Sequence, residues 1–224
     1  MILHVVTLFP EFFESPLKAS LLGKAIQSGI LNVRYVNPRD FSENKYKKVD
    51  DHPYGGGAGM VMMAEPIARA VEHIKKEVPE TRVALLAARG KLWNSIAIDE
   101  YAKLPALTLI CGHYEGVDER VAEHVADESI RIGNFVLSGG EVAALTIIDS
   151  LARKLPGFMG NAHSLEHESF DDGASFEHAQ FTRPEVWRNH KVPEVLLSGN
   201  HTRIAAWRHE EAQKFNDKIT KTSS

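Results

Sequence analysis

The chain has 224 residues and a formal net charge of −4, with 43% hydrophobic and 25% charged residues, which is typical of a globular protein. No apolar run reaches the roughly 18–20 residues that a membrane-spanning helix needs, so we expect no membrane partner. The only cysteine, Cys111, excludes an internal disulfide and a zinc site built on several thiolates, and we expect a cytoplasmic protein.

Predicted strands and helices alternate along the chain. Strands are predicted where apolar residues run continuously or alternate, over residues 2–8, 30–36, 82–88, 106–111 and 130–137. Helices are predicted where apolar residues recur every three to four positions, over residues 15–28, 66–78, 94–103, 117–126, 140–155 and 201–218. Continuous apolar runs are typical of parallel strands buried on both faces, so the pattern predicts an α/β fold with a mostly parallel sheet.

The composition of the chain changes near residue 157. Residues 157–180 are rich in Gly, Asn, His, Ser, Asp and Glu, which is typical of a loop or linker. We expect an α/β domain over residues 1–159, a flexible linker over 160–180 and a small helical domain over 181–224. Residues 176–224 hold 8 basic against 6 acidic side chains, on an otherwise acidic body. This asymmetry favours a polyanionic partner, and a solvated helix surface explains it equally well.

A first glycine cluster spans residues 54–60, with the sequence Tyr-Gly-Gly-Gly-Ala-Gly-Met. It lacks the Gly-Lys-Ser/Thr ending of a P-loop, and it does not lie between a strand and a helix as a Rossmann fingerprint must. A nicotinamide-dependent oxidoreductase would also need an acidic residue about 20 positions later, where Pro79 and Thr81 stand instead. We therefore expect either a flexible surface loop or a loop that closely approaches a ligand or partner.

Two further glycine clusters, residues 111–120 and 132–141, each accompany a predicted strand. Ligands bind at the carboxyl edge of open α/β sheets, so the two loops can converge on one ligand through their backbone groups. In the first of them, Tyr114 and Glu115 could flank a flat, cationic ligand. A strand-to-helix turn with a surface tyrosine and a capping glutamate is the alternative.

Seven motifs that cover nearly the whole chain together carry a family resemblance. They are TLFPEFF at 7–13, SLLGKAIQSGI at 20–30, GGGAGM at 55–60, CGHYEGVDERV at 111–121, IGNFVLSGGEVAALTIIDSLAR at 132–153, FTRPEVW at 181–187 and VPEVLLSGNH at 192–201. This set resembles the bacterial tRNA (guanine-N1)-methyltransferase family. Members of that family methylate the guanine just 3′ of the anticodon, guanine 37.

The resemblance implies an N-terminal domain of the SPOUT class, whose chain forms a deep trefoil knot. It also implies an obligate homodimer with the active site shared across the interface, tRNA as a partner, and S-adenosyl-L-methionine as the methyl donor. The residues that match donor-binding positions are Leu86, Ala87, Gly112, Tyr114, Glu115, Gly116, Ile132, Gly133, Asn134, Phe135, Val136, Leu137, Gly139 and Gly140.

Methylation of guanine N1 requires a base for the N1 proton and a cation near O6, where negative charge develops. By the resemblance Arg153 is that cation, and an ion pair with Asp149 on the same helix is the alternative. Glu168 precedes a Ser-Phe pair where the family usually has an aspartate, so it matches the base. The alternatives are that Asp171 or Asp172 is the base, or that the acidic linker has no catalytic role. Because both charges are present, a knotted nucleic-acid-binding module without catalysis is disfavoured.

Magnesium is associated with methyl transfer in the family that the chain resembles. A magnesium ion is possible, but the sequence contains no recognisable set of metal ligands, so we assign no residue to it.

Overall fold

The computed structural model describes residues 1–160, 168–170 and 175–222. The chain divides into two compact units, Met1–Gly160 (unit 1) and Asn161–Ser224 (unit 2). Within the described residues, no helix is both long enough and apolar enough to cross a membrane.

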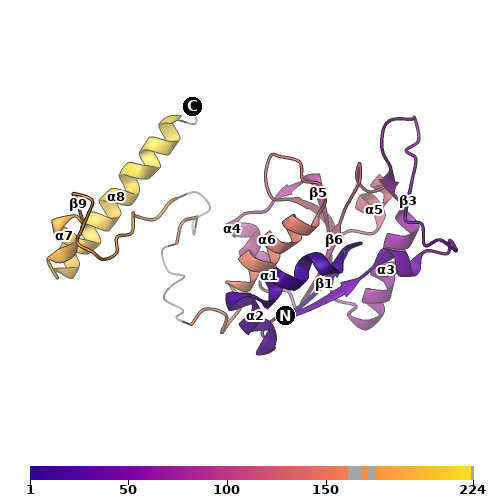
Figure 1. Cartoon of the computed structure of the whole chain (residues 1–224), viewed down its shortest axis with the longest axis horizontal. Helices are drawn as coiled ribbons and strands as arrows, with labels where there is room; N and C mark the ends of the chain where they lie inside the picture. The colour runs from indigo at the N-terminus through magenta and orange to yellow at the C-terminus, as the bar shows by residue number, and fades with distance from the viewer. Residues whose placement is uncertain (161–167, 171–174, 223–224) are drawn as a thin grey trace. The chain divides into compact units, whose positions relative to one another are not determined.

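Unit 1 is built on a five-stranded parallel sheet with the strand order β2-β1-β6-β5-β7 (Figure 1). The strands are β1 (Ile2–Val6), β2 (Asn32–Val36), β5 (Arg82–Leu92), β6 (Ala106–Cys111) and β7 (Glu128–Arg131). β6 occupies the centre of the sheet, and every one of its residues is buried, as its unbroken apolar run predicts. The predicted α/β fold with a mostly parallel sheet is confirmed.

Helices cover both faces of this sheet. Successive strand residues point to opposite faces, so Leu107 and Leu109 of β6 join one core while Ile110 joins the other. The first core also contains residues of α1 (Glu14–Lys18), α2 (Ser20–Gln27), α4 (Ser95–Tyr101) and α6 (Glu141–Ala152). The second contains residues of α3 (Ala64–Glu77) and α5 (Glu119–His124).

The single helix predicted over residues 15–28 is broken in the structure. A 3-10 helix over Pro10–Phe13 precedes α1, and Ala19 between α1 and α2 has extended backbone, with φ −95° and ψ 150°. Gly23 permits this break, because a Cβ atom at this position would lie 2.5 Å from the carbonyl oxygen of Lys18. The apolar spacing is the same on both sides of the break, so the pattern alone could not reveal it.

β5 pairs with β7 in two places. Ala84–Leu86 pair with the beginning of β7 and Lys91–Leu92 pair with its end, while residues 87–90 leave the ladder between them. Gly90 passes so close to Ile130 that a side-chain carbon at position 90 would clash with the backbone of that residue. β5 therefore carries a bulge at residues 87–90.

Two predicted strands differ from the structure at this edge of the sheet. The strand predicted over residues 82–88 continues to Leu92, beyond the bulge. The strand predicted over 130–137 begins two residues earlier and ends at Arg131, so the residues that follow form a loop. Both differences arise from the pairing of β5 with β7, which joins positions about 40 apart in the chain and leaves no local apolar signal.

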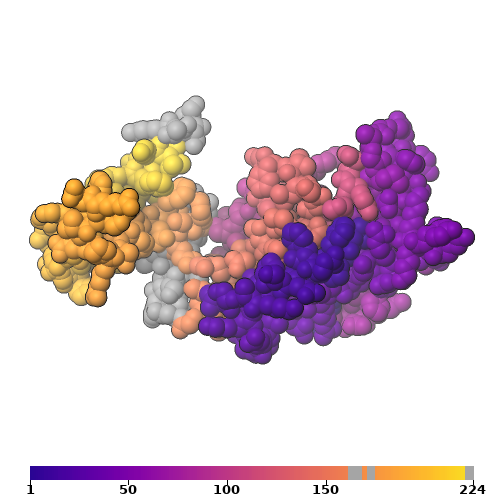
Figure 2. All heavy atoms as spheres, viewed as in Figure 1, coloured from indigo at the N-terminus to yellow at the C-terminus, as the bar shows by residue number. Residues whose placement is uncertain are grey.

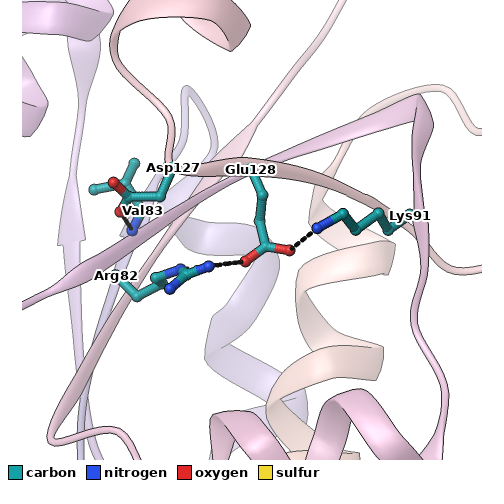
Figure 3. Close-up of polar contacts among 5 residues, drawn as sticks. All are labelled: Arg82, Val83, Lys91, Asp127 and Glu128. Carbon is teal, nitrogen blue, oxygen red and sulfur yellow. Dashed lines mark hydrogen bonds and ion pairs between the residues drawn. The ribbon is translucent and has the colours of Figure 1, made fainter.

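A polar cluster links β5 to β7 beyond their backbone ladder (Figure 3). Glu128 accepts a hydrogen bond from Nη2 of Arg82 at 2.7 Å, and its other carboxylate oxygen lies 3.6 Å from Nζ of Lys91. The neighbouring Asp127 accepts a hydrogen bond from the backbone N–H of Val83 at 2.7 Å. Glu128 of β7 thus contacts side chains on both sides of the bulge in β5, and Asp127 contacts the backbone near its beginning.

Replacing Glu128 with glutamine is expected to lower the free energy of unfolding at neutral pH by about 1–2 kcal/mol. Burial raises the pKa of the Glu128 carboxyl, but the Tyr101 hydroxyl and the Arg82 guanidinium outweigh burial and hold that pKa below its ordinary value. A pKa lowered by folding stabilises the protein above the unfolded-state pKa, and this stabilisation is lost as the pH falls through the folded-state pKa. Urea unfolding of both proteins from neutral pH to about pH 3 should therefore show a difference that shrinks in acid. A difference that does not change with pH would contradict this role.

Unit 2 contains a short hairpin, a short helix and a long helix. They are β8 (Val186–Trp187), β9 (His190–Lys191), α7 (Glu194–Leu197) and α8 (His201–Thr222). Phe176 meets Phe215 of α8 edge to face, with ring centroids 5.3 Å apart, and its backbone N–H donates a hydrogen bond to Oδ1 of Asn216 at 2.8 Å. The helix predicted over residues 201–218 is present, and the hairpin is an element that the sequence pattern did not predict.

Candidate functional site

A pocket of about 380 Å³ lies at the carboxyl ends of β6 and β7 and at the bulge of β5. The three strands are parallel neighbours, so this bulge and the loops that follow β6 and β7 meet at one edge of the sheet. The volume is within the range of small-molecule binding sites. The lining comes from residues 85–89, 112–117, 129–133 and 135–140, together with Glu119, Ala122 and Ala143.

The donor-binding residues expected from the sequence gather in this one pocket, with a single exception. The residues found in the lining are Leu86, Ala87, Gly112, Tyr114, Glu115, Gly116, Ile132, Gly133, Phe135, Val136, Leu137, Gly139 and Gly140. Asn134 lies outside the lining, and its side-chain oxygen accepts a hydrogen bond from Nε of Arg131 at 3.2 Å. The side chain of Asn134 is thus linked to Arg131 within the loop that follows β7, and its role in donor binding stays a prediction.

The segment over residues 112–116 turns sharply after β6. Tyr114 has left-handed backbone, with φ +61°, and Gly116 has φ +128°. A left-handed tyrosine is energetically unfavourable, and such conformations cluster at functional sites. The side chain of Tyr114 is 41% exposed and meets the ring of His113 edge to face, with centroids 5.1 Å apart. The backbone thus presents an accessible aromatic ring at the pocket.

The first glycine cluster, residues 54–60, contacts the segment over residues 112–116. It closes an antiparallel hairpin between β3 (Asp50–Asp51) and β4 (Val61–Met62), which Figure 1 shows at the edge of unit 1. The backbone N–H of Glu115 donates a hydrogen bond to the carbonyl of Met60 at 3.0 Å. A Cβ atom on Gly59 would lie 2.5 Å from Cγ of Glu115. The cluster leads into a strand, so it is not a Rossmann fingerprint, and its glycine at position 59 allows close approach to the pocket loop.

The two pocket loops are in direct contact. The backbone N–H of Gly140 donates a hydrogen bond to the carbonyl of Gly112 at 2.8 Å, and His113 pairs with Gly139 in an antiparallel bridge. A Cβ atom on Gly140 would lie 2.7 Å from Cα of Cys111 and 3.0 Å from the backbone nitrogen of Gly112. Both neighbours are backbone atoms, so the second loop passes the first at a distance that only glycine allows.

A buried carboxylate lies beside this contact. Glu141, the first residue of α6, is 5% exposed and accepts a hydrogen bond from the hydroxyl of Thr7 at 2.8 Å. Its other oxygen lies 4.0 Å from Nδ1 of His113. Burial raises the pKa of the Cys111 thiol and the charge of Glu141 raises it further, so Cys111 remains protonated and is not a nucleophile. Sequence reasoning missed Thr7, His113 and Glu141, because only the fold brings positions 7 and 141 together.

Arg153, the expected cation, lies at the far end of α6 from the pocket. Gly140 is the N-cap of this helix and Arg153 is its C-cap. At about 1.5 Å per residue, the helix separates the two positions by roughly 20 Å, which no side chain can span. Arg153 is also absent from the pocket lining. Within a single chain, the pocket and Arg153 therefore do not meet.

Glu168, the expected base, belongs to unit 2 and is partly buried. The hydroxyl of the next residue, Ser169, accepts a hydrogen bond from the backbone N–H of Glu177 at 3.1 Å. The alternative bases Asp171 and Asp172 lie outside the described residues. The structure thus describes Glu168 within unit 2, and its role as the base stays a prediction.

Comparison with known proteins gives a consistent result over the length of the chain. Residues 1–221 match the family model described as tRNA (Guanine-1)-methyltransferase TrmD. A tRNA (guanine-N(1)-)-methyltransferase of Gloeobacter violaceus is 52% identical over 216 residues, which cover 94% of this chain and 92% of the relative. Proteins with the same name from Geobacillus kaustophilus and Protochlamydia amoebophila are 46% and 42% identical, covering 95% and 98% of this chain and 86% and 97% of the relatives.

Proposed function

The chain belongs to the tRNA (guanine-1)-methyltransferase family, and we propose that it methylates N1 of guanine 37 in tRNA with S-adenosyl-L-methionine as the donor. The enzyme is a tRNA (guanine-N1)-methyltransferase by its family match over residues 1–221 and by relatives 42–52% identical to it. The observation that carries the assignment of the site is the pocket at the carboxyl ends of β6 and β7 and the bulge of β5, where two glycine-rich loops meet.

The pocket residues suit S-adenosyl-L-methionine, which supplies a methyl group activated on a positively charged sulfonium. Gly112 and Gly140 let the backbone of both loops approach the adenine and ribose closely. The exposed ring of Tyr114 offers a flat apolar surface, and the carboxylate of Glu115 favours the sulfonium charge. The remaining lining is largely aliphatic, which suits the adenine ring.

Replacing Gly140 with alanine is expected to weaken S-adenosyl-L-methionine binding at least about tenfold and to destabilise unit 1 by about 1–3 kcal/mol. The new methyl group would push against the backbone of Cys111 and Gly112 and displace the 112–116 loop. Titration calorimetry and thermal unfolding measure the two effects. Gly160→Ala is the matched control, because a Cβ atom there meets nothing within 4 Å. Equal donor affinity in the two variants would remove Gly140 from the proposed site.

The reaction assigns one task to each of two charged residues. Glu168 takes the proton from guanine N1, which frees a lone pair to bond the methyl carbon as the bond between that carbon and sulfur breaks. Arg153 stabilises the negative charge that moves onto O6 when the proton leaves. In this proposal residues 1–159 hold the donor, 160–180 carry the base and 181–224 bind tRNA.

We propose that the enzyme is a homodimer in which one chain supplies the donor pocket and the other supplies Arg153 and Glu168. The roughly 20 Å of helix between Gly140 and Arg153 supports this arrangement, since the pocket cannot use the Arg153 of its own chain. The family match over residues 1–221 supports the trefoil knot of the SPOUT class. A tRNA substrate and a single buried cysteine favour the cytoplasm.

The described residues hold no group of three or more His, Cys, Asp or Glu side chains placed to bind a metal ion. We therefore assign no residue of this part of the chain to magnesium, and no step of the proposed reaction is routed through magnesium.

Mixing two impaired variants, at a donor concentration too low to saturate the Gly140→Ala pocket, is expected to restore methyl transfer. In a shared-site dimer, a Gly140→Ala chain and an Arg153→Ala chain together form one site with an intact pocket and an intact arginine. Random exchange makes about half of the dimers mixed, each with one working site, so about a quarter of the wild-type rate should return. Refolding the two variants together and separately measures this. No recovery in the mixture, with dimers confirmed by sedimentation, would contradict the shared site.

Transfer of a labelled methyl group to tRNA tests the function itself. Unmodified tRNA with guanine at position 37 should accept label from S-adenosyl-L-methionine, and the same transcript with adenine at that position should not. Tight binding of the guanine transcript without incorporation of label would instead indicate a binding module without catalysis.

A further inference from the structure

The β8–β9 hairpin of unit 2 presents an aromatic and basic tip to solvent. Its six residues, Val-Trp-Arg-Asn-His-Lys over 186–191, are all exposed. Trp187 is 59% exposed, although burying an indole is among the largest gains available to a folded chain. Figure 2 shows the orange part of unit 2, which contains the hairpin, at the surface of that unit. The ring of Trp187 is therefore not part of the core of unit 2.

The turn of the hairpin keeps a cation on the exposed indole. Arg188 and Asn189 both have left-handed backbone, with φ 49° and 69°, as a tight hairpin turn requires. Asparagine tolerates this conformation, whereas arginine is unfavourable there. In this conformation the guanidinium carbon of Arg188 lies 5.0 Å from the centroid of the Trp187 ring. The ring of His190 lies 6.3 Å from the indole on the same hairpin.

The positive charges of this tip are not neutralised within the described part of the chain. No described carboxylate lies within ion-pair distance of Arg188 or Lys191, although Glu185 and Glu194 are near them in sequence. By contrast, Lys47 and Lys48 of unit 1 pair with Asp40 and Asp51. An exposed aromatic ring between unpaired cations matches a nucleic-acid strand, which offers a flat base and a phosphate at each step.

We propose that the β8–β9 hairpin is an RNA contact, in which Trp187 stacks on an unpaired base of the tRNA substrate while Arg188 and Lys191 contact adjacent phosphates. This inference rests on the proposed function and adds a contact site and its chemistry. Unpaired bases, as in tRNA loops, can turn out and stack on aromatic side chains, whereas paired bases are hidden in the helix. Guanidinium and ammonium groups supply the charge for the phosphates on either side of such a base.

Trp187→Ala is expected to weaken the binding of unmodified tRNA about tenfold, whereas Trp187→Phe, which keeps a stacking face, should bind within about threefold of the wild type. Arg188→Ala should reduce the slope of log affinity against log salt by about one, because one phosphate contact is removed. The single-turnover methylation rate at saturating tRNA and the affinity for S-adenosyl-L-methionine should not change. Filter binding across a salt series measures affinity and slope without requiring catalysis.

Tyr46→Ala in unit 1 is the matched control. Tyr46 is also exposed, and Nζ of Lys45 lies 4.7 Å from the centroid of its ring, so the control removes a similar aromatic and cation pair elsewhere. An equal loss of tRNA affinity in the Tyr46 and Trp187 variants would contradict the assignment to the hairpin. Sedimentation that reports fewer dimers for Trp187→Ala would also overturn it, because the tip would then contact a second protein chain.

The failure of this inference can be distinguished from failure of the proposed function. A wild-type enzyme that methylates guanine 37, together with a Trp187→Ala variant of unchanged affinity and salt slope, would overturn the hairpin contact alone. A wild-type protein that methylates no tRNA would overturn the proposed function and, with it, the premise of this contact.

Discussion

Replacing Arg153 with alanine is expected to slow methyl transfer about 100- to 1000-fold while the affinity for S-adenosyl-L-methionine stays within about twofold. The proposed site uses the guanidinium only when negative charge develops on guanine O6, so its removal should affect the chemical step and not donor binding. The donor pocket of the same chain is also roughly 20 Å away along α6, which leaves it intact. Single-turnover rates and titration calorimetry separate the two quantities.

Arg153→Lys is the informative companion variant. Lysine keeps the positive charge but lacks the planar, two-pronged donor geometry of arginine, so partial activity is expected. A normal rate in Arg153→Ala would remove Arg153 from catalysis. The residue would then be better explained by an ion pair with Asp149, a contact between neighbours on one helix face that is worth under about 1 kcal/mol.

The second large effect is expected at Glu168. Glu168→Gln keeps the size and hydrogen-bonding capacity of the side chain but cannot accept a proton, so the single-turnover rate should fall about 100- to 10,000-fold. In the wild type, the rate should rise with pH on the acid side of the profile as the base loses its proton. The Glu168→Gln variant should lack this part of the rise. Glu168→Asp should retain much of the activity, because it restores the aspartate that members of the family usually carry at this position.

Comparable single-turnover rates for Glu168→Gln and the wild type would exclude Glu168 as the base. The same measurements on Asp171→Asn and Asp172→Asn would then identify which carboxylate acts. Glutamine and asparagine variants are preferable to alanine variants here, because they preserve side-chain volume and separate loss of proton acceptance from loss of packing.

The parallel sheet and the position of the pocket could be predicted because their signals are local. The buried run over residues 106–111 has no polar interruption, and the glycine-rich turn that begins at Gly112 follows it at once. A parallel sheet then places such turns on one edge, which is where the pocket lies. The individual donor-binding residues came from the family resemblance, and Asn134 is the one among them that lies outside the pocket lining.

The features that could not be predicted depend on contacts between distant positions. The bulge at residues 87–90 exists because β5 pairs with β7 on both sides of it. The sequence predicts Glu141 to be an ordinary carboxylate in the first turn of a helix. Its contacts with Thr7 and His113 arise only in the folded chain. The β8–β9 hairpin has an arginine where a tight turn usually has glycine or asparagine, so its turn carries no ordinary sequence signal.

The most direct test of the proposed function is to locate the methyl group on a tRNA after reaction with the wild-type enzyme and S-adenosyl-L-methionine. An unmodified transcript with guanine at positions 36 and 37 allows the choice between adjacent guanines to be seen. Methylation at N1 blocks base pairing, so reverse transcription should stop immediately before position 37, and mass analysis of the nucleosides should find 1-methylguanosine. A methyl group on another atom or another nucleotide, or a transcript that remains unmodified while the enzyme binds its donor, would contradict the proposed function.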